Sequence, residues 1–504
     1  MRVNNARAMR IDGFALKSSA AAAAAIGANR RPARARGRSG SEEVKTESSG
    51  AKRLRLPVTL FLVSLLIPWI ITVGPMRMSA YRFVLLIWLF PCLAMWLSGK
   101  AGRIRLSDIS LLLYCSWCFL AISMIHGFGY AVQPSGMIFI ETMGAYLFAR
   151  CYIRDAEDFH AMVLLVFKLV AFMLPFAVVE AVTGRNWLLL AFSSINPTFP
   201  DNYLEPRWGL RRVQSVFEHP ILFGVVCASA LAPVHLVLGY GATFAERWPR
   251  TIVIAATAML SLSAGPMTAL SCQAMLLGWN WLLRSVPSRW GILCGLITLQ
   301  ALTIELLSNR AVPVVFMSYF SFDESSAYMR VLIWRYGSAS VLNHPLFGIG
   351  FNPWNRPDWM TTSIDMYWIV DSIRHGLPAG LLLLVTFFSI YLPVAFRSGL
   401  GEKSSVYKTA YLITMTGFFL VGWTVYFWNA TYVVFIFLLG SGVWLLDVER
   451  ETGRSGRVTA KASEPARDDV KTVPEDDLVG IARRAGRRTA RKGKDLDTSN
   501  YRTP

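Results

Sequence analysis

Residues 409–446 read TAYLITMTGFFLVGWTVYFWNATYVVFIFLLGSGVWLL, an apolar block long enough for two membrane-spanning helices. A helix needs about 20 apolar residues to cross the hydrocarbon core of a bilayer. Because every backbone polar group must be satisfied inside lipid, a block of this length favours helices over irregular structure. The 504-residue chain is 54% hydrophobic, with a mean hydropathy of +0.41. We therefore predict an all-α, polytopic integral membrane protein.

The other apolar segments, taken outward from this block, predict about twelve transmembrane helices within residues 57–446. Only Ser263-Ala264-Gly265-Pro266 separates the seventh from the eighth, so these residues could form either a turn or a kink in one long, broken helix. The predicted spans are residues 57–73, 80–98, 106–125, 134–151, 159–182, 217–239, 250–263, 266–284, 290–307, 376–396, 407–423 and 427–446.

The charges of the short loops predict the orientation of these helices. Cytoplasmic loops carry an excess of lysine and arginine, and alternate loops of this chain are basic, whereas residues 127–136 and 263–266 contain no basic residue. Arg77 and Arg82, in the first outer loop, are the exception. We expect a bacterial inner-membrane protein with both termini in the cytoplasm. The basic loops contain Lys100, Arg103 and Arg105; Arg150 and Arg154; Arg247 and Arg250; Arg284 and Arg289; and Arg397, Lys403 and Lys408.

Two charged tails flank the apolar region. Residues 1–56 and 447–504 are poor in aromatic residues, a composition typical of disordered segments, and the positive-inside rule predicts cytoplasmic tails. The chain has a net charge of +19, but no aromatic or fold motif accompanies the basic runs, so we expect no nucleic-acid binding. The alanine run at residues 20–25 is too short and too weakly apolar for the core of a signal peptide.

Two predicted outer loops, residues 183–216 and 308–365, are longer than simple connections. Loops of such length are usually functional or disordered, and these two are rich in aromatic residues, proline and arginine, which favours ordered structure. In the larger loop, residues 327–342 have an amphipathic pattern at helical spacing, which predicts a helix in or near the outer interface. We expect both loops to lie in the periplasm.

Arginines in these loops predict a phosphate or pyrophosphate ligand. Arg211 and Arg212 follow one another in the first loop, and Arg330 and Arg335 lie in the amphipathic segment of the second. A guanidinium group keeps its charge at all physiological pH values and can bond two phosphate oxygens at once. The alternative for each single arginine is an interfacial anchor or a contact with a lipid headgroup.

Histidine is the residue type most suited to take a proton from a hydroxyl near neutral pH. We expect His344 to be the general base, because Pro345 disfavours helical geometry at His344 and leaves it in a turn after the loop helix. His219 stands at the entrance to a span, where a structural role is simpler. Glu218, Asp323 and Asp365 are the other candidate bases. The sequence contains no cluster with metal-ligand spacing.

A charged side chain inside a span is a functional candidate by default. Lys168 falls in the middle of the predicted span 159–182, where it needs an acidic or carbonyl partner. Glu141, in the span 134–151, is the acid that we test first as that partner.

Three segments of the sequence contain short motifs with a characteristic order and spacing. They are Arg211–Gly224, with Phe217, His219-Pro220 and Gly224; Arg330–Gly350, with Trp334 and His344-Pro345-Leu346-x-Gly348-x-Gly350; and Asp365–Gly380, with Tyr367, Gly376 and Gly380. Together with the long outer loop, they resemble the O-antigen ligase and polymerase superfamily of bacterial envelope enzymes. Two positions depart from that pattern: Ala264 replaces an arginine that is frequent in the family, and Met366 replaces an asparagine.

The resemblance implies glycosyl transfer from an undecaprenyl-diphosphate-linked glycan at the periplasmic face, without a cofactor, a metal or a nucleotide sugar. It implies that Arg330 and Arg211 or Arg212 hold the diphosphate and that His344 activates the acceptor hydroxyl. Substrate-binding roles are expected for Arg335 and His219, and for tryptophans that could stack on sugar rings or anchor the loop at the interface, namely Trp334, Trp354 and Trp359.

Three functions remain open at this point. The first is a polymerase of lipid-linked repeat units of a surface or exported polysaccharide, with a flippase and a chain-length regulator as possible partners. The second is a ligase that transfers the finished glycan to lipid A-core or to a protein acceptor. The third is a membrane transporter or flippase, which the lack of internal symmetry disfavours.

Overall fold

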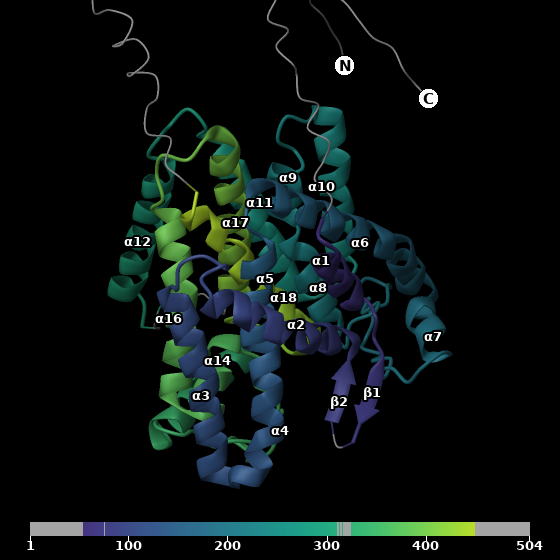
Figure 1. Cartoon of the computed structure of the whole chain (residues 1–504), viewed down its shortest axis with the longest axis vertical. Coiled ribbons are helices and arrows are strands. Elements are labelled where there is room, and N and C mark those ends of the chain that lie inside the picture. Colours follow the sequence, from purple (N-terminus) through teal and green to yellow (C-terminus); the bar gives the residue numbers. More distant parts are fainter. Residues whose placement is uncertain (1–53, 75, 310–311, 313–314, 316–323, 449–504) are drawn as a thin grey trace, which may run out of the picture. The chain divides into compact units, whose positions relative to one another are not determined.

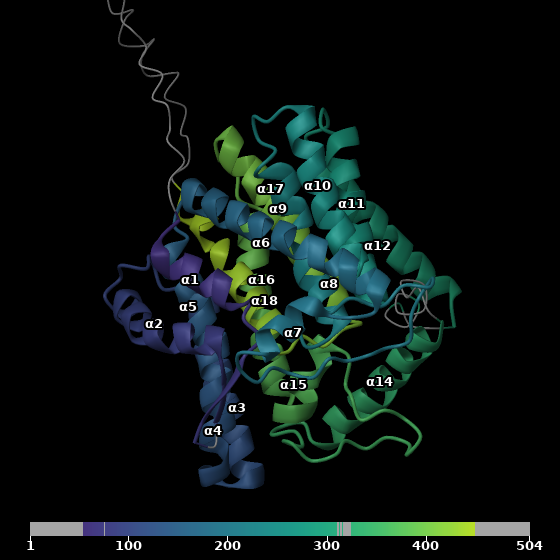
Figure 2. The ribbon, with the colours of Figure 1, turned by 90° about the vertical axis from the view of Figure 1, so that its right-hand side faces the viewer.

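The computed structural model describes residues 54–74, 76–309, 312, 315 and 324–448, so the predicted tails, 1–56 and 447–504, lie almost entirely outside the described residues. The described part is predominantly helical, as predicted (Figures 1 and 2). Its first half contains α1 (Leu56–Ser64), β1 (Ile70–Val73), β2 (Met76–Ser79), α2 (Ala80–Leu97), α3 (Leu106–His126), α4 (Phe128–Phe139), the π-helical turn η1 (Ile140–Gly144), α5 (Ala145–Tyr152), α6 (Ala156–Thr183), α7 (Trp187–Ser193), α8 (Pro220–Ser229) and α9 (Leu231–Leu236).

The second half of the described part continues with further helices. They are α10 (Phe244–Met259), α11 (Ala264–Leu282), α12 (Arg289–Leu307), α14 (Glu324–Asn343), α15 (Tyr367–His375), α16 (Leu377–Ala395), α17 (Glu402–Val421), α18 (Asn429–Ser441) and the 3-10 helix η2 (Val443–Leu446). Within the described residues, six helices are long and apolar enough to cross a membrane. They are α2, α3, α6, α12, α16 and the segment Asn429–Leu446.

The predicted first span, residues 57–73, is wrong over its second half. Helix α1 ends at Ser64, and residues 70–73 instead form strand β1, which pairs antiparallel with β2. Pro68 explains this end, because proline disfavours helical geometry in the residue before it and lacks the N–H that a helix needs. The β-branched residues that follow favour a strand.

The other predicted spans correspond to helices with shifted bounds. The two helices are separate, as one of the two alternatives required, but the turn lies at residues 260–263: α10 ends at Met259, and α11 begins at Ala264, so Gly265 and Pro266 are already helical. The span predicted at 217–239 is divided into α8 and α9 near Ala230, where Pro233 cannot donate a helical hydrogen bond. The helix predicted at residues 327–342 falls within α14, and its location at an interface stays a prediction.

The basic loops predicted for one side of the membrane contact one another. Their contacts bring together the starts or ends of α1, α3, α6, α9 and α17 with the residues after η2. They include the ion pairs Arg105–Asp447, Arg55–Asp158 (3.9 Å) and Lys403–Glu157 (2.8 Å), and the ring contact Tyr240–Tyr407, with ring centroids 6.4 Å apart.

The segments predicted for the opposite side form a second set, joined by backbone and side-chain hydrogen bonds. Figures 1 and 2 show the α3–α4 hairpin and α14 toward one end of the helices and α10 toward the other. The segments joined by these contacts and those joined by the ion pairs above form two separate sets. The bonds of the second set are Ile70 N to Pro197 O (2.8 Å), Val213 N to Leu260 O (3.1 Å), Phe351 N to His126 Nε2 (2.9 Å) and Tyr367 N to Val425 O (3.1 Å).

Candidate functional site

A cavity of about 300 Å³ brings together residues from both long loops, and we call it the arginine cavity. Its lining comes from the loop before α8, the start of α11, helix α14 and the segment before α15. Among its described lining residues, three are arginines and one is an aspartate. The polar and charged residues that line it are Arg207, Arg212, His219, Ser326, Arg330, Thr361 and Asp365.

The turn between α10 and α11 positions two of these arginines. Arg207 donates from Nη1 to the Leu262 carbonyl (3.1 Å), and Arg212 donates from Nη2 to Ser263 Oγ (2.9 Å). Leu262 has a φ of +45°, an unfavourable conformation for a residue with a side chain. The short connection thus supplies acceptors that orient arginines from another loop.

Helix α14 carries Arg330 into the same cavity. Its Nε donates to the Thr424 carbonyl (2.8 Å) and its Nη1 to the Ser326 carbonyl (2.6 Å), one turn earlier on the helix. The residue is only 8% exposed. Carbonyls from two elements therefore fix the guanidinium, which places a preorganised cation at the cavity wall.

His219 is the N-cap of α8 and a neutral member of the cavity. Its Nδ1 accepts a hydrogen bond from the Ile221 N–H (3.1 Å), so the proton of the neutral ring is on Nε2. Burial, and after it the charge of Arg212, lowers the pKa of His219 to about 4. His219 can therefore serve as a hydrogen-bond donor to an anionic ligand, but it is a weak base at neutral pH.

The lowered pKa predicts a pH-dependent stability. The unfolded chain protonates this histidine below about pH 6.5, while the folded chain resists protonation down to about pH 4. The contribution of His219 to stability is therefore complete above about pH 6.5 and decreases as the pH falls toward 4. His219→Asn keeps an N-cap acceptor but cannot titrate, so we expect its melting temperature to fall less than that of the wild type between pH 7 and pH 4.5. Identical decreases in the two proteins would contradict this assignment of the pKa.

Arg211 does not line the arginine cavity, although it is the neighbour of Arg212. It forms ion pairs with Glu180 (Nε to Oε1, 3.7 Å) and with Asp201. Glu180 in turn accepts the backbone N–H groups of Gln214 and Ser215, both at 3.0 Å. Arg211 and Glu180 thus hold the loop in shape, and Arg212 is the one of the two arginines that faces the cavity.

The other predicted substrate-binding residues lie outside the lining of the arginine cavity. Arg335 is exposed, with its guanidinium 5.9 Å from the Tyr336 ring centroid, and Trp334 packs edge-on against Trp423. Trp354 is buried and donates from Nε1 to the Thr362 carbonyl (3.0 Å). The roles of Trp334 and Trp354 in stacking on sugar rings stay predictions.

His344 directly follows α14, as its proline neighbour predicts. Its backbone carbonyl accepts the Gly348 N–H (3.1 Å), and its side chain is exposed. It is not among the residues that line the arginine cavity, which instead contains Asp365, one of the secondary candidate bases. Ser363 Oγ donates a hydrogen bond to Asp365 Oδ1 and orients this carboxylate.

The proposed pairing of Lys168 with Glu141 is wrong. Glu141 accepts hydrogen bonds from Tyr81 Oη (3.0 Å) and from Arg82 Nε (2.8 Å), while Lys168 is exposed on α6. The ion pair between Arg82 and Glu141 also explains why Arg82 departs from the charge rule for the predicted outer loops, because the charge of Arg82 is compensated within the protein.

Among the described residues, no three histidine, cysteine, aspartate or glutamate side chains are grouped so that they could hold a metal ion. No protein-family model matches the chain, and no curated protein is similar to it in sequence.

Proposed function

We propose that this chain is a bacterial inner-membrane glycosyltransferase that polymerises undecaprenyl-diphosphate-linked oligosaccharide repeat units at the periplasmic face. The proposal rests on the composition of the arginine cavity. Arg207, Arg212 and Arg330 suit the two phosphates of such a donor, because guanidinium groups bond pairs of phosphate oxygens. The neutral His219 adds a hydrogen-bond donor.

In the proposed reaction, an acceptor hydroxyl attacks the anomeric carbon of the lipid-linked glycan. The new bond joins the acceptor oxygen to this carbon, and the bond between the carbon and the phosphate oxygen breaks. Undecaprenyl diphosphate leaves with the electron pair of the broken bond, so negative charge grows on its phosphate oxygens. Preorganised cations stabilise such developing charge without needing to rearrange during the reaction.

The hydroxyl proton needs an acceptor, and Asp365 is the group whose location supports this role best. It lies in the same cavity as Arg330 and Arg212, and its carboxylate is held by Ser363. A carboxylate within reach of the hydroxyl can act as general base and then pass the proton to water. This proposal replaces His344, which is exposed and lies outside the lining.

The two sets of loop contacts support the finer topology that we propose, with about twelve crossings and both termini in the cytoplasm. The set that contains Arg105, Lys403 and Asp447 is basic, and basic loops stay in the cytoplasm. The arginine cavity and the two long loops would then face the periplasm.

Labelling of single cysteines tests this orientation. Asn352→Cys and Glu402→Cys both replace exposed residues, one in each set of loops. In intact spheroplasts, a membrane-impermeant maleimide should modify position 352 and should modify position 402 only after the membrane is opened. The reverse pattern would overturn the proposed topology.

The glycan of a deletion strain tests the function itself. If the protein is a polymerase, its deletion should shorten the surface glycan to single repeat units, and the wild-type gene should restore the full range of chain lengths. If the protein is a ligase, its deletion should instead cause long glycan to accumulate on the lipid carrier without reaching the acceptor. An unchanged glycan, with no lipid-linked intermediate accumulated, would refute both.

A further inference from the structure

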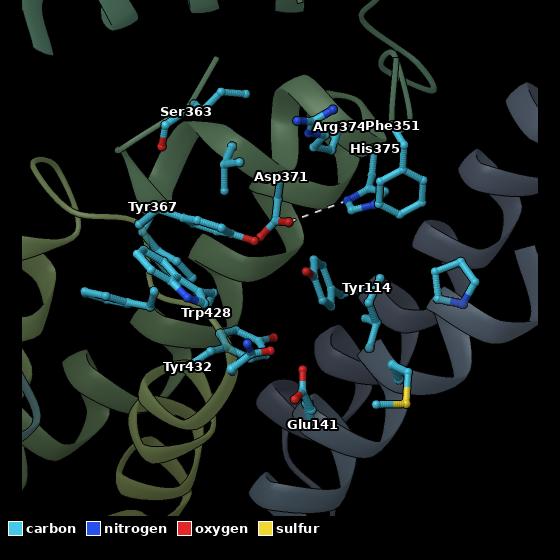
Figure 3. A pocket seen from close by; sticks show the side chains of 18 of the residues that line it. Tyr114, Glu141, Phe351, Ser363, Tyr367, Asp371, Arg374, His375, Trp428 and Tyr432 are labelled. Atoms are coloured by element: carbon cyan, nitrogen blue, oxygen red, sulfur yellow. Dashed lines mark ion pairs between the residues drawn. The ribbon is translucent and has the colours of Figure 1, made fainter. Parts of the chain in front are cut away.

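A second cavity, of about 470 Å³, lies beneath α15, and we call it the aromatic cavity. Its volume falls in the range of about 300–1,000 Å³ that is usual for small-molecule sites. Tyrosines and other aromatic side chains form much of its wall, and two carboxylates, an arginine and a histidine face it. Figure 3 shows Tyr367, Asp371 and His375 on α15, with Glu141 and Tyr114 across from them.

Two buried polar side chains of this cavity have no hydrogen-bond partner among the described residues. His375 is 5% exposed, and both of its ring nitrogens lack a hydrogen bond, although Nδ1 lies 3.5 Å from Asp371 Oδ1. The Tyr367 hydroxyl is also unpartnered, in a residue that is 1% exposed. Buried polar groups are normally satisfied, because an unpaired one costs about 1–3 kcal/mol. Their location in the cavity wall points to a ligand with hydroxyl groups.

The opposite wall is a fixed polar surface. Glu141 lies in the π-helical turn η1, a local departure from α-helix that is frequent at functional sites. Arg82 joins Glu141 to Asn429, with Nη2 2.8 Å from Asn429 Oδ1, and Asn429 Nδ2 donates to Glu218 (2.7 Å). Asn429 has a φ of +48°, and this network holds it in place. The carboxylate of Glu141 is thereby oriented and its charge compensated, which suits hydrogen bonding to a neutral ligand.

The segment 361–365, before α15, forms a partition between the aromatic cavity and the arginine cavity. Along the segment before α15, Thr361 and Asp365 line the arginine cavity, whereas Thr362, Ser363 and Ile364 line the aromatic cavity. The Ser363–Asp365 hydrogen bond crosses this partition. On another side, His219 of the arginine cavity contacts Trp428 of the aromatic cavity, with ring centroids 6.1 Å apart.

We propose that the aromatic cavity binds the acceptor saccharide. Flat aromatic side chains match the apolar face of a sugar ring, and Tyr367, His375 and Glu141 supply donors and acceptors for its hydroxyl groups. The inference rests on the proposed function, because it places the acceptor beside the diphosphate site, on the other side of the partition. For the reaction, the acceptor hydroxyl must pass the segment 361–365 to reach Asp365, which lines the arginine cavity and is hydrogen-bonded by Ser363 of the aromatic cavity.

A free oligosaccharide, prepared by partial acid hydrolysis of the organism's own surface glycan, tests this site. It lacks a diphosphate leaving group, so it can react only as an acceptor. Wild-type protein in nanodiscs, supplied with lipid-linked repeat units, should extend the labelled oligosaccharide. For both Tyr367→Phe and His375→Gln, we expect the KM for the oligosaccharide to rise about 5- to 100-fold, the effect of losing a buried hydrogen bond. The KM for the lipid-linked donor should stay within about twofold.

Tyr411→Phe is the matched control. Tyr411 is also buried, but it lies outside both cavities and donates to the Leu439 carbonyl (2.9 Å). Its variant should lose thermal stability and keep the wild-type KM, whereas Tyr367→Phe should keep the wild-type melting temperature. An unchanged oligosaccharide KM in both cavity variants, or no extension of the oligosaccharide by a wild-type protein that still polymerises lipid-linked units, would overturn the acceptor site alone. Failure of the lipid-linked units to react would refute the proposed function instead.

Discussion

Arg330→Ala is expected to reduce glycan polymerisation by about 10²–10³-fold, the usual cost of removing one group that stabilises developing charge. Arg330 is the buried cation of the arginine cavity, and carbonyls of Thr424 and Ser326 hold it there. Arg330→Lys should recover only part of the activity, because lysine keeps the charge but loses the planar fork. The measurement is the initial rate of polymerisation by purified protein, together with the membrane level of each variant.

Arg335→Ala is the control for this experiment, since Arg335 is on the same helix but exposed and outside the cavity. It should retain most of the activity and the normal membrane level. If Arg330→Lys were fully active, or if Arg335→Ala lost as much activity as Arg330→Ala, paired bonding of the diphosphate by Arg330 would be excluded.

Asp365→Asn is expected to lower the rate by about 10²–10⁴-fold, which is typical for the loss of a general base. Asparagine has nearly the same shape and can still accept the hydrogen bond from Ser363, so the partition between the two cavities should keep its structure. The KM values for donor and acceptor should change little, because the substitution removes the proton acceptor and leaves the binding groups.

Two further variants serve as comparisons for Asp365→Asn. Asp358→Asn removes an exposed carboxylate from the same loop and should be as active as the wild type. His344→Ala should keep much of its activity, because this exposed side chain is outside the arginine cavity. An inactive His344→Ala beside an active Asp365→Asn would return the role of the base to His344, as the sequence alone had suggested.

Sequence patterns predicted the helices better than their ends. Hydropathy located most of the long helices because lipid requires continuous apolar segments, and amphipathic spacing located α14. The error at residues 57–73 arose because the apolar pattern does not distinguish the end of α1 from strand β1, although Pro68 was a usable signal.

The candidate site was predictable by residue type but not by side-chain direction. Arg211 and Arg212 are adjacent and chemically identical, and only the folded loop turns one toward Glu180 and Asp201 and the other toward the cavity. The aromatic cavity was missed because its residues come from α3, α4, η1, α15, the start of α18 and the segments before α15 and α18, which tertiary packing brings together. The four-residue spacing of Asp371 and His375 was the one local signal for it.

Reconstitution with lipid-linked repeat units tests the central claim most directly. The purified protein in nanodiscs is given these units alone, and glycosidic bonds and released undecaprenyl diphosphate are counted in the same sample. The account predicts chains of increasing length and one undecaprenyl diphosphate released for each glycosidic bond formed, with both lost in Arg330→Ala. Unchanged lipid-linked units after incubation with well-folded wild-type protein would contradict it.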